Sequence, residues 1–390
     1  MSKIIYLDNA ATTKVRKEVV DEMIKYLSEN YGNPSSGIYE IGRASKAVVE
    51  KARKTIADFI NADEGEVYFT SCGTESDNWA IKGVAFANEK KGKHIITTKI
   101  EHHAVLHTCE YLEKFGFETT YLDVDKYGMV DLEELKKAIR KDTILISVMY
   151  ANNEIGTIQP IAEIGKIAKE NGIIFHTDAV QALGGVKIDV KAQNIDLLSM
   201  SAHKVHGPKG IGGMYIRKGV KIDNFMHGGA QEKRRRAGTE SVHNIAGFGK
   251  AVELLSKEFD EKNRKLITLR TRLIEGIKGK IDDVVLNGHP IYRLPNNVNF
   301  SFKFIEGESI LLWLDMDGVC ASSGSACTSG SLDPSHVLLA TGLDHGTAHG
   351  SIRFTIGDDT TEEDIDFVVN KMVEIVEKLR FMSPLYKNKK

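Results

Sequence analysis

The side chains of this sequence that could do chemistry gather directly after four short apolar runs. The stretches that follow these runs are 71–75 (SCGTE), 151–154 (ANNE), 176–181 (HTDAVQ) and 201–204 (SAHK). If each run is a strand of one mainly parallel sheet, the carboxyl ends of the strands meet at the edge where open α/β sheets bind ligands. The sequence therefore predicts that a lysine, an aspartate and a turn of small residues surround one ligand.

Two of these stretches indicate where an anion and a cation would bind. Gly73 and Thr74 lie in a turn that leads into a helical pattern, and backbone N–H groups at a helix start suit a phosphate, although an ordinary strand-to-helix turn has the same residues. Asp178 follows a buried run, where a carboxylate requires a cation or several donors. A protonated pyridine nitrogen would be such a cation, and a partner within the protein is the alternative.

Lys204 lies beside His203 in SAHKVHGPKG, where glycines allow other groups to approach closely. A lysine amine titrates near ~10.4 and is a weak nucleophile at neutral pH. A Schiff base with an aldehyde cofactor removes that obstacle. Together with Asp178 and the phosphate turn, Lys204 therefore indicates a cofactor site.

The four cysteines have different surroundings. Cys327 lies in SSGSACTSGS, a serine- and glycine-rich stretch that is typical of a mobile loop and would carry one thiol. Cys109 and Cys320 fit packed positions in a helix and a strand. Cys72 adjoins the proposed phosphate turn, and whether its thiol reacts is open. The spacing matches neither a disulfide framework nor a zinc site, so no metal is expected.

Arg353 lies within the apolar stretch SIRFTIG. A guanidinium in an apolar strand requires a carboxylate, which it can bind through two hydrogen bonds. The partner is either a carboxylate of the protein or the α-carboxylate of an amino-acid substrate.

The elements that must position these residues form an α/β pattern. Between about residues 60 and 220 short apolar runs alternate with helical patterns, which predicts a mainly parallel sheet covered by helices. A long helical pattern begins at Ile245, and a smaller α+β domain follows it, ending in a helix capped by Thr361 with Asp364. We expect an N-terminal segment (1–15) that packs with the small domain, a large cofactor-binding domain (16–255) and a small domain (256–390) that carries the cysteine stretch.

Composition narrows the class of protein. The chain is 42% hydrophobic and 27% charged with a formal net charge of -2, which is ordinary for a globular protein and gives no field that would attract nucleic acid. Lys233 to Arg236 is one local basic run. The opening apolar run, Ile4 to Leu7, is too short for a signal peptide or a membrane span, so we expect a cytoplasmic protein without a membrane partner.

With these residues assembled, the sequence resembles the cysteine desulfurases of the NifS and IscS type, which are fold type I pyridoxal-phosphate enzymes. The resemblance spans nearly the whole chain through the ordered motifs YLDNAATT, GNPSS, CGTES, EHHAVL, ANNEIG, HTDAVQ, SAHKVHGPKG, RRRAGTESVHN, SSGSACTSG and SIRFTIG. The long stretch around Cys327 resembles the NifS and IscS branch more than the SufS branch.

The resemblance implies a role for each matching position. Lys204 would form the Schiff base with pyridoxal phosphate, Asp178 would pair with the pyridine nitrogen and Gln181 would bind the ring hydroxyl. The remaining roles are the phosphate contacts (Gly73, Thr74, Ser201, His203), ring stacking and proton transfer (His102), contact with the phosphate of a neighbouring subunit in a homodimer (Thr239), the substrate carboxylate (Asn153, Arg353) and sulfur capture as a persulfide (Cys327).

The implied activity is the conversion of L-cysteine into alanine and a persulfide on Cys327. The acceptor is open: an iron–sulfur cluster scaffold, a tRNA-thiolation partner and a nitrogenase supply route all fit, and so does help from Cys327 in holding a transferred cluster. Activity on selenocysteine is also open. A selenocysteine lyase or an aminotransferase would share Lys204 and Asp178, and a non-catalytic metal or iron–sulfur scaffold is an alternative of another class.

Overall fold

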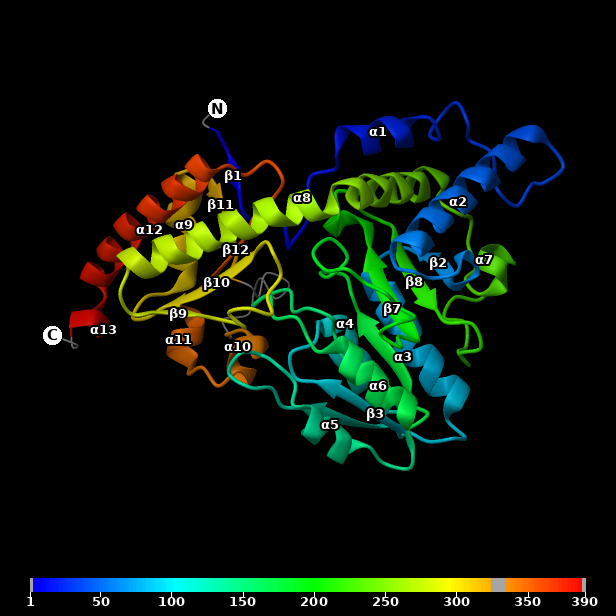
Figure 1. Cartoon of the computed structure of the whole chain (residues 1–390), viewed down its shortest axis with the longest axis horizontal. Coiled ribbons are helices and arrows are strands. Elements are labelled where there is room, and N and C mark those ends of the chain that lie inside the picture. Colours follow the sequence, from blue (N-terminus) through cyan, green and yellow to red (C-terminus); the bar gives the residue numbers. More distant parts are fainter. Residues whose placement is uncertain (1–2, 324–333, 388–390) are drawn as a thin grey trace.

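The computed structural model describes residues 3–323 and 334–387. Its larger part is built on a seven-stranded sheet whose strands run parallel except for one (Figure 1). The strand order is β2 (Val67–Thr70), β8 (Gly212–Ile216), β7 (Leu197–Ser201), β6 (Ile174–Asp178), β5 (Thr143–Ser147), β3 (His94–Thr98) and β4 (Glu118–Leu122). The strand that runs antiparallel to its neighbours is β8.

Helices cover both faces of this sheet. The helices α3 (Gly73–Asn88) and α4 (His103–Glu113) pack on one face, and α2 (Glu40–Phe59), α6 (Ile161–Glu170) and the first part of α8 (Val242–Lys280) pack on the other. The alternation of side chains along β8 serves both cores, because Met214 and Ile216 join the core with α3 while Tyr215 joins the opposite one. The prediction of a mainly parallel α/β sheet is confirmed.

Short elements connect these layers. They are α1 (Lys17–Ile24), η1 (Glu64–Glu66), α5 (Leu132–Ala138), η2 (Ala202–Lys204) and α7 (Gln231–Arg234). The sequence reasoning missed β4, since its residues ETTYL contain no continuous apolar run and the strand lies at the sheet edge. It also ended β6 too early: the strand continues to Asp178, so His176 and Thr177 lie within it and are buried.

The smaller part has an antiparallel sheet of order β12 (Ser351–Thr355), β10 (Asn297–Phe302) and β9 (Val284–Leu286), with β1 (Ile5–Tyr6) paired to β11 (Val319–Cys320) beside it. Its helices are α9 (Gly307–Met316), α10 (His336–Ala340), α11 (His345–His349), α12 (Glu362–Met382) and α13 (Pro384–Lys387). The predicted cap of α12 is confirmed, because Thr361 and Asp364 form a reciprocal capping box.

The 39-residue helix α8 joins the two parts and contributes side chains to both cores. In Figure 1 it runs across the molecule from one sheet to the other. Leu255 and Phe259 belong to the first core, and Leu266 and Leu273 belong to the second. Because one helix serves both cores, the exact boundaries at 15/16 and 255/256 stay predictions.

The N-terminal segment also connects the two parts. Leu7 is fully buried in the core of the smaller part, and Asp8 makes a parallel bridge with Thr355 of β12. Five residues later, the backbone N–H of Thr13 donates to the carbonyl of His203 at 3.0 Å. The segment therefore passes from the β12 sheet to the loop that carries Lys204.

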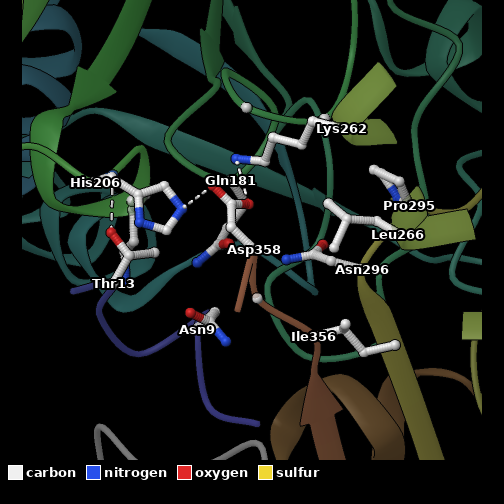
Figure 2. Close-up of a pocket in the computed structure, with 14 residues that line it drawn as sticks. Asn9, Thr13, Gln181, His206, Lys262, Leu266, Pro295, Asn296, Ile356 and Asp358 are labelled. Atoms are coloured by element: carbon white, nitrogen blue, oxygen red, sulfur yellow. Dashed lines mark hydrogen bonds and ion pairs between the residues drawn. The ribbon is translucent and has the colours of Figure 1, made fainter. Parts of the chain in front are cut away.

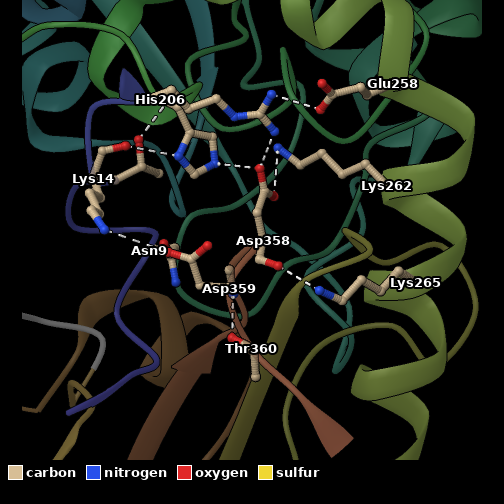
Figure 3. Close-up of polar contacts among 12 residues, drawn as sticks. Asn9, Lys14, His206, Glu258, Lys262, Lys265, Asp358, Asp359 and Thr360 are labelled. Carbon is tan, nitrogen blue, oxygen red and sulfur yellow. Dashed lines mark hydrogen bonds and ion pairs between the residues drawn. The ribbon is translucent and has the colours of Figure 1, made fainter. Parts of the chain in front are cut away.

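A partly buried carboxylate stabilises this junction (Figure 3). Asp358, just after β12, contacts Arg16 at 2.5 Å, His206 at 3.2 Å and Lys262 of α8 at 3.2 Å. Burial alone would raise the pKa of the Asp358 carboxyl, but the hydrogen bond from His206 and the positive charges around it hold the pKa well below its ordinary value. Asp358 thus links the N-terminal segment, the Lys204 loop and α8.

No helix among the residues that the structure describes is long and apolar enough to cross a membrane.

Replacing Asp358 tests this junction. We expect Asp358→Asn to lower the free energy of unfolding by roughly 3 kcal/mol, because Arg16 and Lys262 lose their shared anion and His206 loses a hydrogen-bond acceptor. The carboxylate stabilises the fold above its unfolded pKa of ~3.9 and this stabilisation is lost as the pH falls below that value. Denaturant unfolding measured from pH 7 to pH 3 should therefore show that the free energy of unfolding falls less with pH in the variant than in the wild type.

Asp359→Asn is the matched control, since its side chain is 90% exposed and lies 4.0 Å from Lys14. Equal stabilities of the two variants at pH 7 would contradict the role given to Asp358.

Candidate active site

One cavity of about 430 Å³ lies at the carboxyl ends of the parallel strands. Its volume falls in the range of about 300–1,000 Å³ that is typical of small-molecule sites. The predicted site residues that line it are Gly73, Thr74, His102, Asn153, Asp178, Gln181, Ser201, His203, Lys204 and Arg353. Thr239 is exposed and does not line this cavity, and Cys327 lies outside the described residues.

Lys204 ends the short helix η2, which follows directly from β7. Its Nζ donates to the backbone carbonyl of Ala10 at 2.5 Å and to that of Ala11 at 2.8 Å. The amide of Gln181 donates to the same Ala10 carbonyl at 2.9 Å. The amine is therefore held at the cavity wall by the N-terminal segment, a contact that the sequence reasoning did not anticipate.

Asp178 places a carboxylate on the wall of the same cavity. It is 6% exposed, and its Oδ1 accepts a hydrogen bond from the backbone N–H of Val180 at 2.9 Å. Burial raises the pKa of the Asp178 carboxyl, and the positive potential of His102 and Lys204 only partly offsets this. A cationic group bound in the cavity would stabilise the ionised form of this carboxylate.

The start of α3 and the end of β7 form a cradle for an anion. A Cβ at Gly73 would lie 2.7 Å from Cγ2 of Val180, which is too close for any residue but glycine. Glycine therefore leaves space for a ligand beside the N-terminus of α3. Ser201 is buried, and its hydroxyl has no hydrogen-bond partner among the described residues. An unsatisfied buried hydroxyl beside a helix start fits a ligand with oxygen acceptors, such as a phosphate.

His203 presents a neutral ring to the site, and His102 lies at the start of α4. Burial and the charge of Lys204 lower the pKa of His203 to about 4, and its Nδ1 lies 3.2 Å from the hydroxyl of Thr12. His102 caps α4, because its Nδ1 accepts the backbone N–H of Ala104 at 3.1 Å. In a neutral ring this hydrogen bond assigns the proton to Nε2.

The neighbouring histidine is a separate feature. His103 does not line the cavity, and it packs against His107 and His336 with ring centroids 4.9 and 4.8 Å away. Burial and these neighbouring rings lower the pKa of His103 to about 4. The geometry therefore distinguishes the two histidines, because His102 lines the cavity and His103 does not.

Arg353 already has a carboxylate partner in the protein. Its Nη2 donates to Oδ1 of Asp8 at 2.8 Å, and its Nη1 donates to the backbone carbonyl of Asn153 at 3.1 Å. Its Nε is buried without a hydrogen-bond partner among the described residues. Of the two partners that the sequence left open, the structure contains the internal one.

The sequence reasoning missed Asp77, which lines the cavity from α3 and is 1% exposed. Burial and the nearby charge of Asp178 raise the pKa of Asp77 well above its ordinary value. The sequence did contain a signal for Asp77. It lies four residues, about one helical turn, after Gly73, and it therefore falls on the same face of the helix. Cys72 also lines the cavity as the N-cap residue of α3.

A second, much smaller cavity of about 30 Å³ is also lined by Lys204. Figure 2 shows Gln181, His206 and Asp358 among its labelled side chains. It is lined by Asn9, Thr13, Gln181, His206 and Asp358 among others, which makes its wall mostly polar. Its size suits a water molecule with several hydrogen-bond partners. Lys204 is therefore next to a ligand-sized space and a water-sized one.

The chemistry of the larger cavity fits an aromatic aldehyde phosphate. An amine for the aldehyde (Lys204), a buried carboxylate for a protonated ring nitrogen (Asp178) and an anion cradle (Gly73, Ser201) face one space. Among residues 3–323 and 334–387, no group of three or more histidine, cysteine, aspartate or glutamate side chains is arranged to hold a metal ion.

Comparison with known proteins adds independent evidence. A family model described as Aminotransferase class-V matches residues 5–368. Cysteine desulfurase IscS of Methanosarcina thermophila is 65% identical over 384 residues, which cover 98% of this chain and 95% of that relative. A solved structure described as a NifS-like protein has 40% identity and a TM-score of 0.91, covering 97% of this chain and 100% of its own. A structure described as SspA in complex with cysteine has 36% identity and a TM-score of 0.81, covering 90% and 98%.

Ser201 provides a test of the anion cradle. We expect Ser201→Ala to leave the stability of the cofactor-free protein unchanged or slightly higher, because its hydroxyl loses no hydrogen bond, and to weaken the binding of pyridoxal phosphate at least about tenfold. Thermal unfolding and equilibrium dialysis measure the two effects.

Ser76→Ala is the matched control, since the Ser76 hydroxyl lies 2.8 Å from Oγ1 of Thr70 and bonds the Gly213 carbonyl. That variant should lose about 1–2 kcal/mol of stability. Unchanged cofactor affinity in Ser201→Ala would remove Ser201 from the phosphate site.

Proposed function

Because the chain belongs to the class-V aminotransferase family and is a pyridoxal-phosphate-dependent cysteine desulfurase, we propose that the 430 Å³ cavity is its active site and that Cys327 receives the sulfur. The observation that supports this most is the placement of Lys204 and Asp178 on the wall of a single cavity. The assignment of each residue's role below is part of the proposal.

Each cofactor-binding residue contacts a different part of the cofactor in this proposal. Lys204 supplies the amine for the aldehyde, and Asp178 supplies the anion for the ring nitrogen, while Gln181 binds the ring hydroxyl and His102 stacks on the ring. Gly73, Thr74, Ser201 and His203 bind the phosphate. Bound pyridoxal phosphate supplies an aldehyde that condenses with amines and a ring that withdraws electrons from the substrate Cα.

The substrate is oriented by the groups on the other side of the cavity. Arg353 and Asn153 hold the carboxylate of L-cysteine, which fixes the Cα–H bond relative to Lys204. Nζ of Lys204, held near the carbonyls of Ala10 and Ala11, accepts and returns the Cα proton. His102, with its proton on Nε2, provides a proton for the departing carbon fragment or removes one from a thiol.

The sulfur step joins two sulfur atoms. The Cys327 thiolate attacks the sulfur of the substrate, an S–S bond forms and the substrate Cβ–S bond breaks. The electron pair of that bond stays with Cβ, which takes up a proton, so that the carbon is reduced while sulfur is oxidised. The products are L-alanine and a persulfide on Cys327, and no external oxidant or reductant is required.

The wider setting is also proposed. Thr239 would reach the phosphate site of a second copy of the chain in a homodimer, which agrees with its exposure and its absence from the wall of its own cavity. The persulfide would pass to an acceptor protein such as an iron–sulfur cluster scaffold. The cytoplasm is the proposed location, and the free thiols of Cys72, Cys109 and Cys320 agree with a reducing compartment.

Lys204→Ala tests the cofactor assignment. The variant should lose the yellow absorbance of the purified enzyme and all measurable release of alanine from cysteine, because Lys204 is the one lysine among the described residues that line the cavity. Lys218→Ala, which removes an exposed lysine after β8, is the control and should keep both. Turnover by Lys204→Ala at the rate of the control would refute the assignment.

Cys327→Ala tests sulfur capture. The variant should retain the cofactor and its absorbance change on addition of cysteine, because the cavity keeps its groups, but it should form no protein persulfide. Mass spectrometry after treatment with cysteine and an alkylating reagent measures the persulfide, and Cys320→Ala serves as the control. Full persulfide formation by Cys327→Ala would assign the sulfur acceptor to another thiol.

A further inference from the structure

The guanidinium of Arg353 is a buried cation held by several contacts. Its side chain is 3% exposed, and its Nη1 and Nη2 donate to the Asn153 carbonyl and to the Asp8 carboxylate. Asp8 is the ion-pair partner of Arg353 in the described chain, at 2.8 Å. The charge that the proposed function assigns to the substrate carboxylate is therefore already balanced by a residue of the enzyme.

The backbone around Asp8 keeps its carboxylate at this place. Asp8 is bridged to Thr355 of β12, two residues from Arg353 on the same strand, and its carbonyl accepts a hydrogen bond from the Tyr6 hydroxyl at 3.0 Å. The next residue, Asn9, donates its side-chain amide to the Thr355 carbonyl at 2.8 Å. Because Arg353 and the backbone bridge of Asp8 both belong to β12, the backbone of Asp8 is held beside Arg353.

We propose that Asp8 is a positioning residue that sets the affinity of the enzyme for the substrate carboxylate, because it orients the Arg353 guanidinium and competes for its charge. This inference rests on the proposed binding of the substrate carboxylate by Arg353. Asp8 and the Asn153 carbonyl use two of the five N–H donors of the guanidinium. The other donors, which include the Nε–H without a partner in the described chain, are left for an incoming carboxylate. Asp8 and the Asn153 carbonyl fix the plane of the guanidinium, so that these donors keep their direction.

The competition has a direction that can be measured. Two carboxylates that share one buried guanidinium repel each other, so the internal carboxylate weakens the binding of the substrate and of the product, which carries the same group. An asparagine at position 8 keeps an oxygen that accepts the Nη2 hydrogen bond but removes the competing charge. A neutral residue at position 8 should therefore tighten carboxylate binding without changing the reacting groups.

The test uses propionate, a carboxylate without an amino group or sulfur. In Asp8→Asn the dissociation constant for propionate should fall at least about threefold, both by thermal stabilisation of the cofactor-free protein and by competitive inhibition of the holoenzyme. The KM for cysteine should fall similarly while kcat changes less than about twofold. Asp359→Asn removes the same charge from an exposed position and should change none of these values.

Asp8→Ser is measured in parallel, in case Asp8→Asn does not fold. The serine side chain is also neutral, and because it is smaller it leaves room for water beside the guanidinium. A folded neutral variant that binds propionate no more tightly than the wild type would overturn the inference, and so would a variant in which only the melting temperature falls. If propionate neither stabilises nor inhibits the wild type, and Arg353→Lys leaves the KM for cysteine unchanged, the proposed role of Arg353 fails instead.

Discussion

The site depends on the cost of burying charge. Asp178 and Arg353 are each almost fully buried. Among the described residues, Asp178 accepts a hydrogen bond from the backbone of Val180, and Arg353 is paired with the Asp8 carboxylate. Buried charges are tolerated only when partners compensate them. The cavity between these groups is therefore suited to a ligand that carries both a cationic ring and an anion, and pyridoxal phosphate with an amino-acid substrate provides both.

The N-terminal segment, residues 8–13, connects these charges. Its side chains and carbonyls contact Arg353 through Asp8, Lys204 through Ala10 and Ala11, and the Lys204 loop through Thr13. At the junction beyond it, Asp358 binds Arg16, His206 and Lys262. The strand β12 of Arg353 and the loop of Lys204 after β7, which belong to different parts of the molecule, are thus held in one arrangement by a segment of a few residues.

Much of this could be predicted from the sequence because it follows from local patterns. The alternation of apolar runs predicted the parallel sheet, and the sheet rule for ligand sites brought Gly73, Asp178 and Lys204 to one cavity. The polar edge strand β4 was missed because its residues lack an apolar run. The partnership of Asp8 with Arg353 and of Ala10 with Lys204 joins residues more than 190 positions apart, and no local pattern encodes such contacts.

The central claim is that the amine of Lys204 and the carboxylate of Asp178 hold one aromatic aldehyde between them. The most direct measurement is reduction of the purified holoenzyme with borohydride, followed by proteolysis and mass spectrometry of the labelled peptide. The account predicts a pyridoxyl phosphate group on Lys204 in the wild type, with much less label in Asp178→Ala. Label on a different lysine, or full labelling in the absence of the Asp178 carboxylate, would contradict it.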